Sequence, residues 1–335
     1  MMDRRKLLKV IGAGAGACAA QAVMPTTAEA RAGKKMPSEA LGLLFDGTLC
    51  IGCRACIPAC KESNGMPPER TQLEAGNVWD APLDISGKTL NVIKVYRDGT
   101  GTKKDEIKDG FAFTKVSCMH CVDPSCVSAC PVSAMIKDSV TGIVHYDVEA
   151  CIGCRYCVGA CPFNVPRFTF DTPDPKISKC QLCAHRLPQG KYAACAEVCP
   201  TGATLFGPVS ELRKEVARRR ALAPGTQTKF PRGRIGGRDF YEGKVGTYVD
   251  HVYGDKEIGG TQVLHLSGVP FELLDKPALP DESPARVSET LQHTIYKHLI
   301  APIGFLGVLG ALAFKHMRGA PDETEPEDDT EGKTP

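Results

Sequence analysis

Cys151-Ile152-Gly153-Cys154-Arg155-Tyr156-Cys157-Val158-Gly159-Ala160-Cys161-Pro162 is the stretch that decides the fold. Its four cysteines follow the spacing C-x2-C-x2-C-x3-C, and a proline comes directly after the last one. The first three cysteines can wrap around one face of a tight turn, in which backbone N–H groups point at the sulfurs. The proline turns the chain away after the fourth cysteine and removes an N–H group. Such a turn indicates thiolates gathered around bound metal.

The whole chain of 335 residues contains 17 cysteines, and sixteen of them fall into four groups of this kind. The other three groups are Cys50/Cys53/Cys56/Cys60, Cys118/Cys121/Cys126/Cys130 and Cys180/Cys183/Cys195/Cys199. Disulfide frameworks rarely pack cysteines this tightly, because each bridge needs its own geometry. Zinc sites made only of cysteine usually pair two C-x2-C knuckles across a longer gap. Cubane [4Fe–4S] clusters therefore explain the pattern better than either alternative.

The ligand sets follow from the two-cluster ferredoxin pattern, in which the last cysteine of a group ligates the other cluster. Three groups end in Cys-Pro, and the run from Cys130 to Ile136 is echoed by the run from Cys199 to Leu205, an internal repeat. We predict four sets: site 1 is Cys50, Cys53, Cys56 and Cys199; site 2 is Cys60, Cys180, Cys183 and Cys195; site 3 is Cys118, Cys121, Cys126 and Cys161; site 4 is Cys130, Cys151, Cys154 and Cys157. The predicted fold is α+β, with two nested two-cluster ferredoxin-like modules built from short β-hairpins and helices.

The N-terminus predicts a twin-arginine export signal over residues 1–30. Arg4 and Arg5 precede a largely apolar stretch, and Ala28-Glu29-Ala30 supplies a cleavage site. The twin-arginine route carries folded proteins, which suits a protein that receives its clusters before export. An ordinary secretory signal is the alternative, and either one removes Cys18.

The C-terminus predicts a single transmembrane anchor at 295–316 and an acidic, disordered cytoplasmic tail at 317–335. Leu299–Phe314 has sixteen residues without a charge, slightly short of the roughly 17–25 that span a bilayer. Lys315, His316 and Arg318 follow at once, and positive residues favour the cytoplasmic side. The body of the protein would then lie on the periplasmic side of the inner membrane. A buried core helix is the alternative.

Between the ends we predict a four-cluster domain at 31–207, interrupted by a Gly/Pro-rich insertion at 61–116 with one strand at Asn91–Tyr96. A hairpin is expected from Met135-Ile136 to Ile143–Tyr146, with its turn at Thr141-Gly142. Arg167–Phe170 reads as a further short strand.

Residues 208–294 are expected to form one helix and an extended segment that wraps over the core or a partner. The helix is predicted at Ser210–Leu222, capped by Ser210 and stopped by Pro224. Its arginines indicate a solvated face, or else contact with acidic lipid or a partner; they are Arg213, Arg218, Arg219 and Arg220.

Other functions find little support in the sequence. A net charge of +2 argues against a nucleic-acid binder. No catalytic triad, phosphate loop or dinucleotide fingerprint stands out. The scattered histidines are interpreted as ordinary surface or core residues; they are His120, His145, His185, His251, His265 and His293.

The arrangement resembles the four-cluster ferredoxin-like subunits of membrane-bound respiratory oxidoreductases. It is most similar to the HybA-type iron–sulfur subunit of hydrogenase-2. The stretches that carry this similarity include Cys118–Pro124, Thr141–Asp147, Cys154–Cys157, Tyr253–Glu257, Gly260–Leu264 and Gly268–Pro270.

The resemblance implies a non-catalytic electron-transfer subunit with four [4Fe–4S] clusters. Its partners would be a hydrogenase large subunit that oxidises hydrogen, a hydrogenase small subunit that donates electrons, and an integral membrane subunit that reduces quinone. Two alternatives stay open. One is the equivalent carrier of a molybdopterin oxidoreductase, such as a formate dehydrogenase or a sulfur-compound reductase. The other is a non-redox scaffold or assembly protein.

Overall fold

The computed structural model describes residues 30–67, 82–170, 173 and 175–318. They belong to two units, one spanning Arg31–Val287 and the other containing the residues from Ser288 onward. All sixteen cysteines of the four groups lie in the first unit. The predicted export signal, with Cys18, and nearly all of the predicted acidic tail lie outside the described residues.

A four-stranded sheet in the order β11-β9-β1-β13 forms the centre of the first unit. Its strands are β1 (Leu41–Asp46), β9 (Thr204–Pro208), β11 (Gly233–Arg234) and β13 (Val263–Leu266). In the register, Leu44 lies opposite Leu264 of parallel β13 and opposite Leu205 of antiparallel β9. Five of the six residues of β1 are buried, because the strand is covered on both faces.

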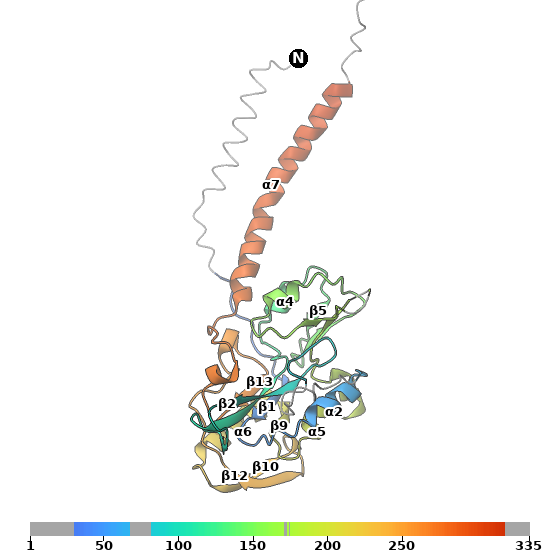
Figure 1. Cartoon of the computed structure of the whole chain (residues 1–335). Helices are drawn as coiled ribbons and strands as arrows, with labels where there is room; N and C mark the ends of the chain where they lie inside the picture. Colours follow the sequence, from blue (N-terminus) through green and yellow to red (C-terminus); the bar gives the residue numbers. More distant parts are fainter. Residues whose placement is uncertain (1–29, 68–81, 171–172, 174, 319–335) are drawn as a thin grey trace, which may run out of the picture. The chain divides into compact units, whose positions relative to one another are not determined.

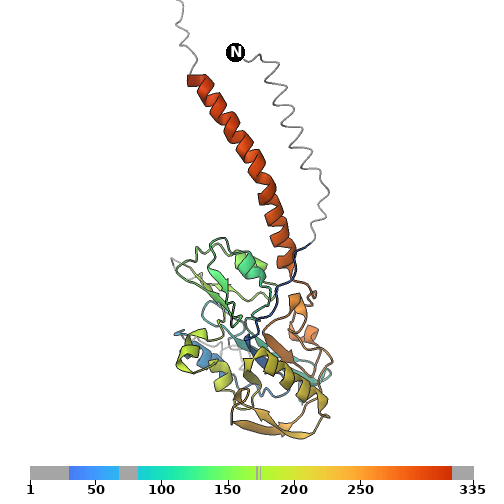
Figure 2. The ribbon, with the colours of Figure 1, turned by 180° about the vertical axis from the view of Figure 1, so that it is seen from behind.

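Helix α6 (Val209–Ala221) covers one face of this sheet. Figure 2, which views the molecule from behind, shows this helix in yellow. Its buried Leu212 and Val216 pack against Leu44 and Leu205. The predicted helix is confirmed, but the predicted cap is wrong: the helix begins after Pro208, and Ser210 lies inside its first turn. The Val209 N–H is satisfied by the Ala40 carbonyl at 2.8 Å.

Four short helices, one from each cysteine group, contain five of the sixteen cysteines and pack in two pairs. They are α2 (Cys56–Ser63), α3 (Ser125–Ser128), α4 (Tyr156–Ala160) and α5 (Ala194–Glu197). Helix α2 packs against α5, and α3 packs against α4; α2 and α5 lie side by side in Figure 1. The first cysteine group thus meets the last, and the two middle groups meet each other, in the nested order that the spacing predicts.

Two small hairpins accompany the middle pair of helices. One joins β5 (Met135–Lys137) to β6 (Val144–Tyr146), as predicted. The other joins β7 (Arg167–Phe168) to β8 (Ile177–Ser178), so the predicted strand at 167–170 forms in its first two residues.

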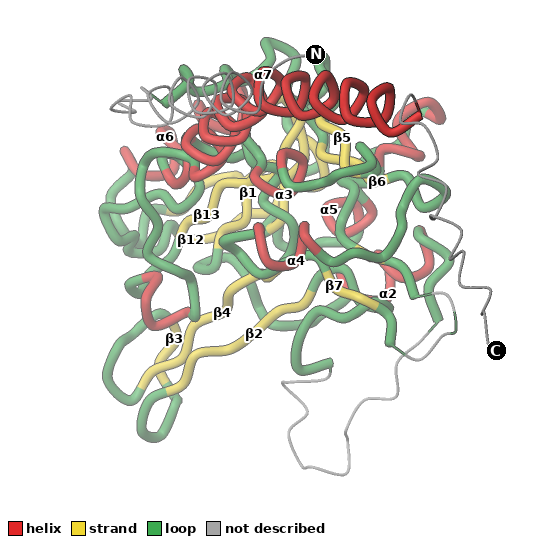
Figure 3. Tube along the Cα trace, turned by 90° about the horizontal axis from the view of Figure 1, so that it is seen from above, coloured by secondary structure: helices red, strands yellow, loops and turns green. Residues whose placement is uncertain are grey.

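The predicted insertion contains more structure than the single strand expected. Strand β2 (Val92–Arg97) forms where it is predicted, and it pairs with β4 (Gly110–Val116), which pairs in turn with β3 (Lys103–Lys104). Figure 3 shows β2 and β4 running side by side. The Gly/Pro-rich composition of the whole segment did not indicate β4. Residues Ala112 to Lys115 of this strand are buried.

The segment after α6 contributes strands to the same unit. It contains the hairpin of β10 (Gln227–Pro231) and β12 (Phe240–Lys244), the 3-10 helices η4 (Glu257–Gly259) and η5 (Phe271–Leu274), and β13. A further 3-10 helix, η3 (Ala184–Gln189), follows Cys183. Because β13 pairs with β1 in the central sheet, the unit extends across the predicted boundary at residue 207.

The C-terminal helix α7 runs over Pro284–Arg318 and includes the predicted anchor at 295–316. Within the described part of the chain, no helix is long and apolar enough to cross a membrane. The predicted transmembrane span therefore stays a prediction.

Candidate metal centres

Each cysteine group begins with a turn whose third residue has a left-handed backbone. The φ values directly before the second cysteine are 69° at Gly52, 48° at His120, 69° at Gly153 and 53° at Leu182. This conformation curls the C-x2-C segment so that backbone N–H groups face the thiols. At Gly52 glycine is also needed for space, since a Cβ would lie 2.4 Å from Cζ of Phe113.

Two backbone N–H groups and one side-chain amide lie within reach of cysteine sulfurs. The Leu182 N–H donates to Sγ of Cys180, and the Thr204 N–H donates to Sγ of Cys199, both at 3.4 Å. The Asn64 side-chain amide lies 3.7 Å from Sγ of Cys60. Donors of this kind stabilise negative charge on a thiolate, and around an iron–sulfur cluster they also influence its potential.

Three of the four predicted ligand sets each line a cavity. One cavity is lined by the four cysteines of site 1, a second by those of site 2 and a third by those of site 4. Each contains about 340 Å³ of space free of protein atoms, including the part that opens to solvent. In the site 2 cavity, the buried Ser117 hydroxyl has no hydrogen-bond partner among the described residues.

The thiols of each set also interact electrostatically with one another. Burial raises the pKa of Cys50 and of Cys60 to about 12, and thiols of the same predicted set contribute: Cys56 and Cys199 at Cys50, and Cys195 and Cys183 at Cys60.

The two middle groups show the same pattern. At site 3, burial raises the pKa of Cys121 well above its ordinary value, with contributions from Cys161, Cys118 and Cys126. At site 4, burial raises the pKa of Cys157 to about 11, with contributions from Cys130, Cys151 and Cys154. The structure thus brings together the four cysteines of each predicted set, although ligation by them stays a prediction.

Interactions between sets place the sites in a row. Burial raises the pKa of Cys195 in site 2 to about 11, and the Cys56 thiol of site 1 adds to this. Burial also raises the pKa of Cys180 in site 2, to which Cys118 of site 3 contributes. Burial of Cys126 in site 3 raises its pKa to about 12, with a contribution from Cys157 of site 4. Packing gives the same neighbours: α2 lies on α5, Cys180 of site 2 packs with Cys118 and Cys161 of site 3, and Cys126 of site 3 packs with Cys157 of site 4. The order of neighbours is therefore site 1, site 2, site 3, site 4.

The arrangement of the donors distinguishes between kinds of metal. None of the sixteen cysteines is paired in a disulfide. Among the described residues, no group of three or more His, Cys, Asp or Glu side chains could hold a metal ion. A zinc ion would need sulfurs about 2.3 Å from one centre. In three of the four sets the thiols line one shared cavity, and four cysteine thiolates are the donor set of a [4Fe–4S] cluster.

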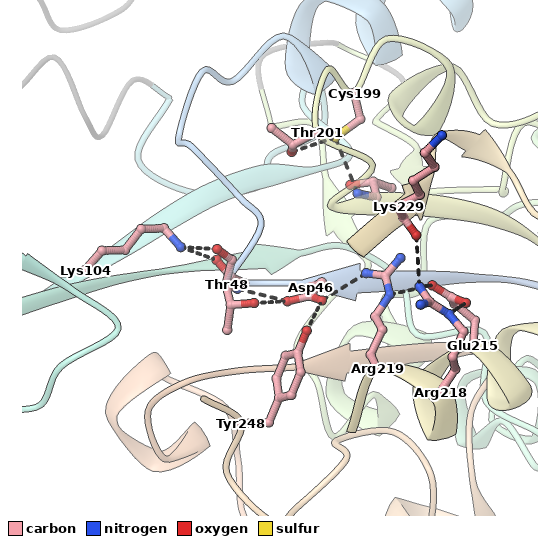
Figure 4. Close-up of polar contacts among 12 residues, drawn as sticks. Asp46, Thr48, Lys104, Cys199, Thr201, Glu215, Arg218, Arg219, Lys229 and Tyr248 are labelled. Carbon is pink, nitrogen blue, oxygen red and sulfur yellow. Dashed lines mark hydrogen bonds and ion pairs between the residues drawn. The ribbon is translucent and has the colours of Figure 1, made fainter. Parts of the chain in front are cut away.

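A buried ion-pair network fixes the loop that leads to Cys50 (Figure 4). Asp46 and Arg219 are both fully buried, and Asp46 Oδ2 accepts hydrogen bonds from Arg219 Nη1 at 2.9 Å and from the Tyr248 hydroxyl at 2.8 Å. Asp46 Oδ1 accepts from the N–H and the hydroxyl of Thr48, at 3.0 and 2.7 Å. The interpretation of the α6 arginines as a solvated face is therefore wrong for Arg219, whose guanidinium belongs to the core.

Sequence reasoning missed two polar residues of the site 2 cavity, Asn91 and Lys115. Both lie in the segment interpreted as an insertion, far along the chain from the cysteines that they face. The histidines give no comparable signal: Nδ1 of buried His120 accepts a hydrogen bond from the Val144 N–H at 3.0 Å, which is a structural role.

Comparison with known proteins agrees with this geometry. A family model described as a 4Fe-4S dicluster domain matches residues 110–209. The chain is 44% identical over 322 residues to the hydrogenase-2 operon protein HybA of Escherichia coli O157:H7, covering 95% of this chain and 96% of that protein. The chain belongs to the HybA family of iron–sulfur electron-transfer subunits. The resemblance seen in the sequence is thereby confirmed, as is the mixed α+β ferredoxin-like dicluster fold.

More distant relatives serve other enzymes. The nitrate-inducible formate dehydrogenase iron–sulfur subunit of Escherichia coli K12 is 32% identical over 293 residues, which is 86% of this chain and 88% of that protein. The formate dehydrogenase-O iron–sulfur subunit of the same strain is 33% identical over 299 residues, 87% of each chain. The family is thus one of non-catalytic electron-transfer subunits of oxidoreductases.

Proposed function

We propose that this chain holds four [4Fe–4S] clusters at sites 1 to 4 and relays electrons between the subunits of a membrane-bound nickel–iron uptake hydrogenase. Each cluster, when bound, takes up and releases one electron. The protein positions four thiolates per cluster, excludes water and supplies hydrogen bonds to sulfur. The observation that carries the proposal is that three cavities are each lined by the four cysteines of one predicted set.

The two ends of the row suit contact with redox partners. Cys53 in site 1 and Cys154 in site 4 are exposed, whereas every cysteine of sites 2 and 3 is buried or half-buried. Large apolar side chains are exposed beside both ends: Ile51 is 54% exposed near site 1, and Ile152 and Tyr156 are 65% and 64% exposed near site 4. We propose that the hydrogenase small subunit docks at one end and an integral membrane quinone-reactive subunit at the other.

A test of the ligand sets uses the last cysteine of each outer group. In the anaerobically purified holoprotein, Cys199→Ser should change the same EPR signal as Cys53→Ser, and Cys60→Ser the same signal as Cys183→Ser. If the last cysteine of each group instead ligates the cluster of its own group, Cys199→Ser should change the same EPR signal as Cys183→Ser. Iron and acid-labile sulfide near sixteen of each per wild-type chain are expected, and their absence would overturn the proposal.

The hydrogenase assignment rests on the greater identity to HybA than to the formate dehydrogenase subunits, 44% against 32–33%. The alternative is the equivalent carrier of a molybdopterin oxidoreductase, which the second group of relatives supports. Purification from membranes, followed by identification of the bound subunits, separates the two. A nickel–iron large subunit supports the proposal, and a molybdopterin subunit supports the alternative.

We further propose that the chain is exported by the twin-arginine route and held at the periplasmic side of the inner membrane by residues 295–316. Exposed apolar side chains on α7 support an apolar environment there; they include Ile303, Leu306, Val308, Leu312 and Phe314. Replacing Arg4 and Arg5 together by lysine keeps the charge and should retain the protein in the cytoplasm. Ending the chain at residue 294 should release the exported protein into the soluble periplasm, and retention on carbonate-washed membranes would contradict the anchor.

A further inference from the structure

Lys115 is a fully buried lysine in the middle of the cysteine framework. It lies on β4 and is 0% exposed, and its Nζ donates a hydrogen bond to Oδ1 of Asn91 at 3.0 Å. Asn91, 2% exposed, in turn donates through Nδ2 to the carbonyl oxygen of Cys56 at 3.2 Å. The side-chain amide therefore fixes the ammonium group against the first residue of α2.

The same two residues face site 2. Both line the cavity formed by Cys60, Cys180, Cys183 and Cys195. Lys115 therefore lies in the wall of site 2, and Asn91 connects its ammonium group to the carbonyl oxygen of Cys56, a residue of site 1. The ammonium is a positive charge placed mainly at site 2 and secondarily at site 1.

A buried charge is costly unless it is compensated. Within the described part of the chain, the ion pairs between basic and acidic side chains do not include Lys115. The negative charge that faces this lysine comes from the cysteines. A set of four thiolates around a cluster is anionic, so the lysine is placed where an anionic occupant compensates it.

We propose that Lys115, held in place by Asn91, raises the reduction potential of site 2 above the value that the same four cysteines would give without it. This inference rests on the proposed clusters. One-electron reduction adds one negative charge to the site, and a fixed cation stabilises the reduced form more than the oxidised form. No proton or further reactant takes part. Lys115 is a positioning residue for electron transfer, because it acts through charge without ligating iron.

The test is an EPR-monitored redox titration of the anaerobically purified full-length holoprotein. Lys115→Met removes the charge while keeping a long apolar side chain, and we expect the midpoint potential of site 2 to fall. A smaller fall is expected at site 1, and none at sites 3 and 4. Lys115→Arg retains the charge and should stay close to wild type, which separates charge from packing.

Lys191→Met is the matched control. Lys191 is exposed in a groove beside Ala194, the residue next to the site 2 ligand Cys195. Because water screens an exposed charge, removing it should leave the site 2 potential unchanged. An equal fall in Lys191→Met and Lys115→Met would overturn the proposal.

A second variant tests the proposal if the Lys115→Met protein fails to fold or to take up its clusters. Asn91→Asp keeps the lysine but gives it a carboxylate partner, which cancels its charge at site 2, so the potential should again fall. An unchanged site 2 potential in an iron-replete Lys115→Met or Asn91→Asp protein would overturn the proposed role of Lys115 and leave the proposed function of the chain intact. Wild-type protein with no reducible cluster at site 2 would overturn the proposed function as well.

Discussion

Gly52 and Gly153 occupy the same position in two cysteine turns and differ in their surroundings. Both have φ of 69°, so a side chain added at either position would cause the same backbone strain. A Cβ at Gly52 would lie 2.4 Å from the Phe113 ring, whereas at Gly153 the nearest atom, the Pro175 carbonyl oxygen, would be 3.2 Å away. The turn of site 1 therefore has the Phe113 ring directly against it, whereas the turn of site 4 has more space at the same position.

We predict that Gly52→Ala lowers iron occupancy at site 1 more than Gly153→Ala lowers it at site 4. The left-handed backbone costs about 1–2 kcal/mol for alanine in both turns, but only Gly52→Ala must also displace Phe113. Iron content and EPR intensity of the two purified variants measure the difference. Equal losses at the two sites would show that backbone strain alone decides.

The pair of Asp46 and Arg219 gives a prediction on stability. Arg219→Met leaves the fully buried Asp46 carboxylate without its cation, and loss of one partner of a buried pair costs about 3–5 kcal/mol. Arg213→Met, on the same helix, removes an ion pair with Asp255 whose two side chains are 44% and 37% exposed, and should cost less than about 1 kcal/mol. Anaerobic denaturant unfolding of the holoproteins measures both, and a similar small effect would contradict the structural role of Arg219.

At the scale of elements, local patterns in the sequence predict local elements. The hairpin of β5 and β6 has a glycine turn between apolar runs, and α6 ends before Pro224. Strand β13 could not be predicted in this way, because its partner β1 lies about 220 residues earlier, with Leu43 opposite Val263. Pairing across such a separation leaves no periodic signal in either segment.

The same distinction applies to the sites. Cysteine spacing predicts which thiols come together, since the turns and short helices that carry them are local. The position of Lys115 depends on sheet register instead. Lys115 lies opposite Ile93, and Asn91 is two residues before Ile93, which places Asn91 diagonally across the strand pair. Spacing along the chain gives no indication of such a pair.

Gln262, fully buried directly before β13, connects the central sheet to the middle cysteine groups. Its Nε2 donates to the carbonyl oxygens of Leu41 and Thr141, at 2.6 and 2.8 Å, and its Oε1 accepts from Lys137 Nζ at 2.5 Å. One side chain thus joins β1 to the last residue of β5 and to the turn that follows it.

We predict that Gln262→Leu loosens this hairpin, because each buried group left without a partner costs about 1–3 kcal/mol. Hydrogen–deuterium exchange at residues 135–146 should become faster, while exchange in α6 stays as in wild type. Gln227→Leu, at an exposed position of β10, is the control and should change neither region. Unchanged exchange in the hairpin would show that the connection carries no local stability.

At the scale of the whole chain, the row of sites accounts for the nested order of the cysteine groups. The outer groups form sites 1 and 2, the inner groups form sites 3 and 4, and Cys180 and Cys118 bring site 2 next to site 3. Nesting therefore places the junction between the modules in the middle of the row and leaves one exposed cysteine near each end, Cys53 and Cys154. Two modules in tandem would need no contact between the first and last groups.

This order predicts which paramagnetic centres interact. In the fully reduced holoprotein, each site should broaden the EPR signals of its neighbours in the row, so sites 2 and 3 have two interacting neighbours and sites 1 and 4 have one. Removing site 2 with Cys183→Ser should sharpen the signals of sites 1 and 3 and leave that of site 4 broadened. Removing site 4 with Cys154→Ser should sharpen only the signal of site 3. Sharpening of site 1 in the second variant would mean that sites 1 and 4 are neighbours, and the row would then have to be redrawn as a ring.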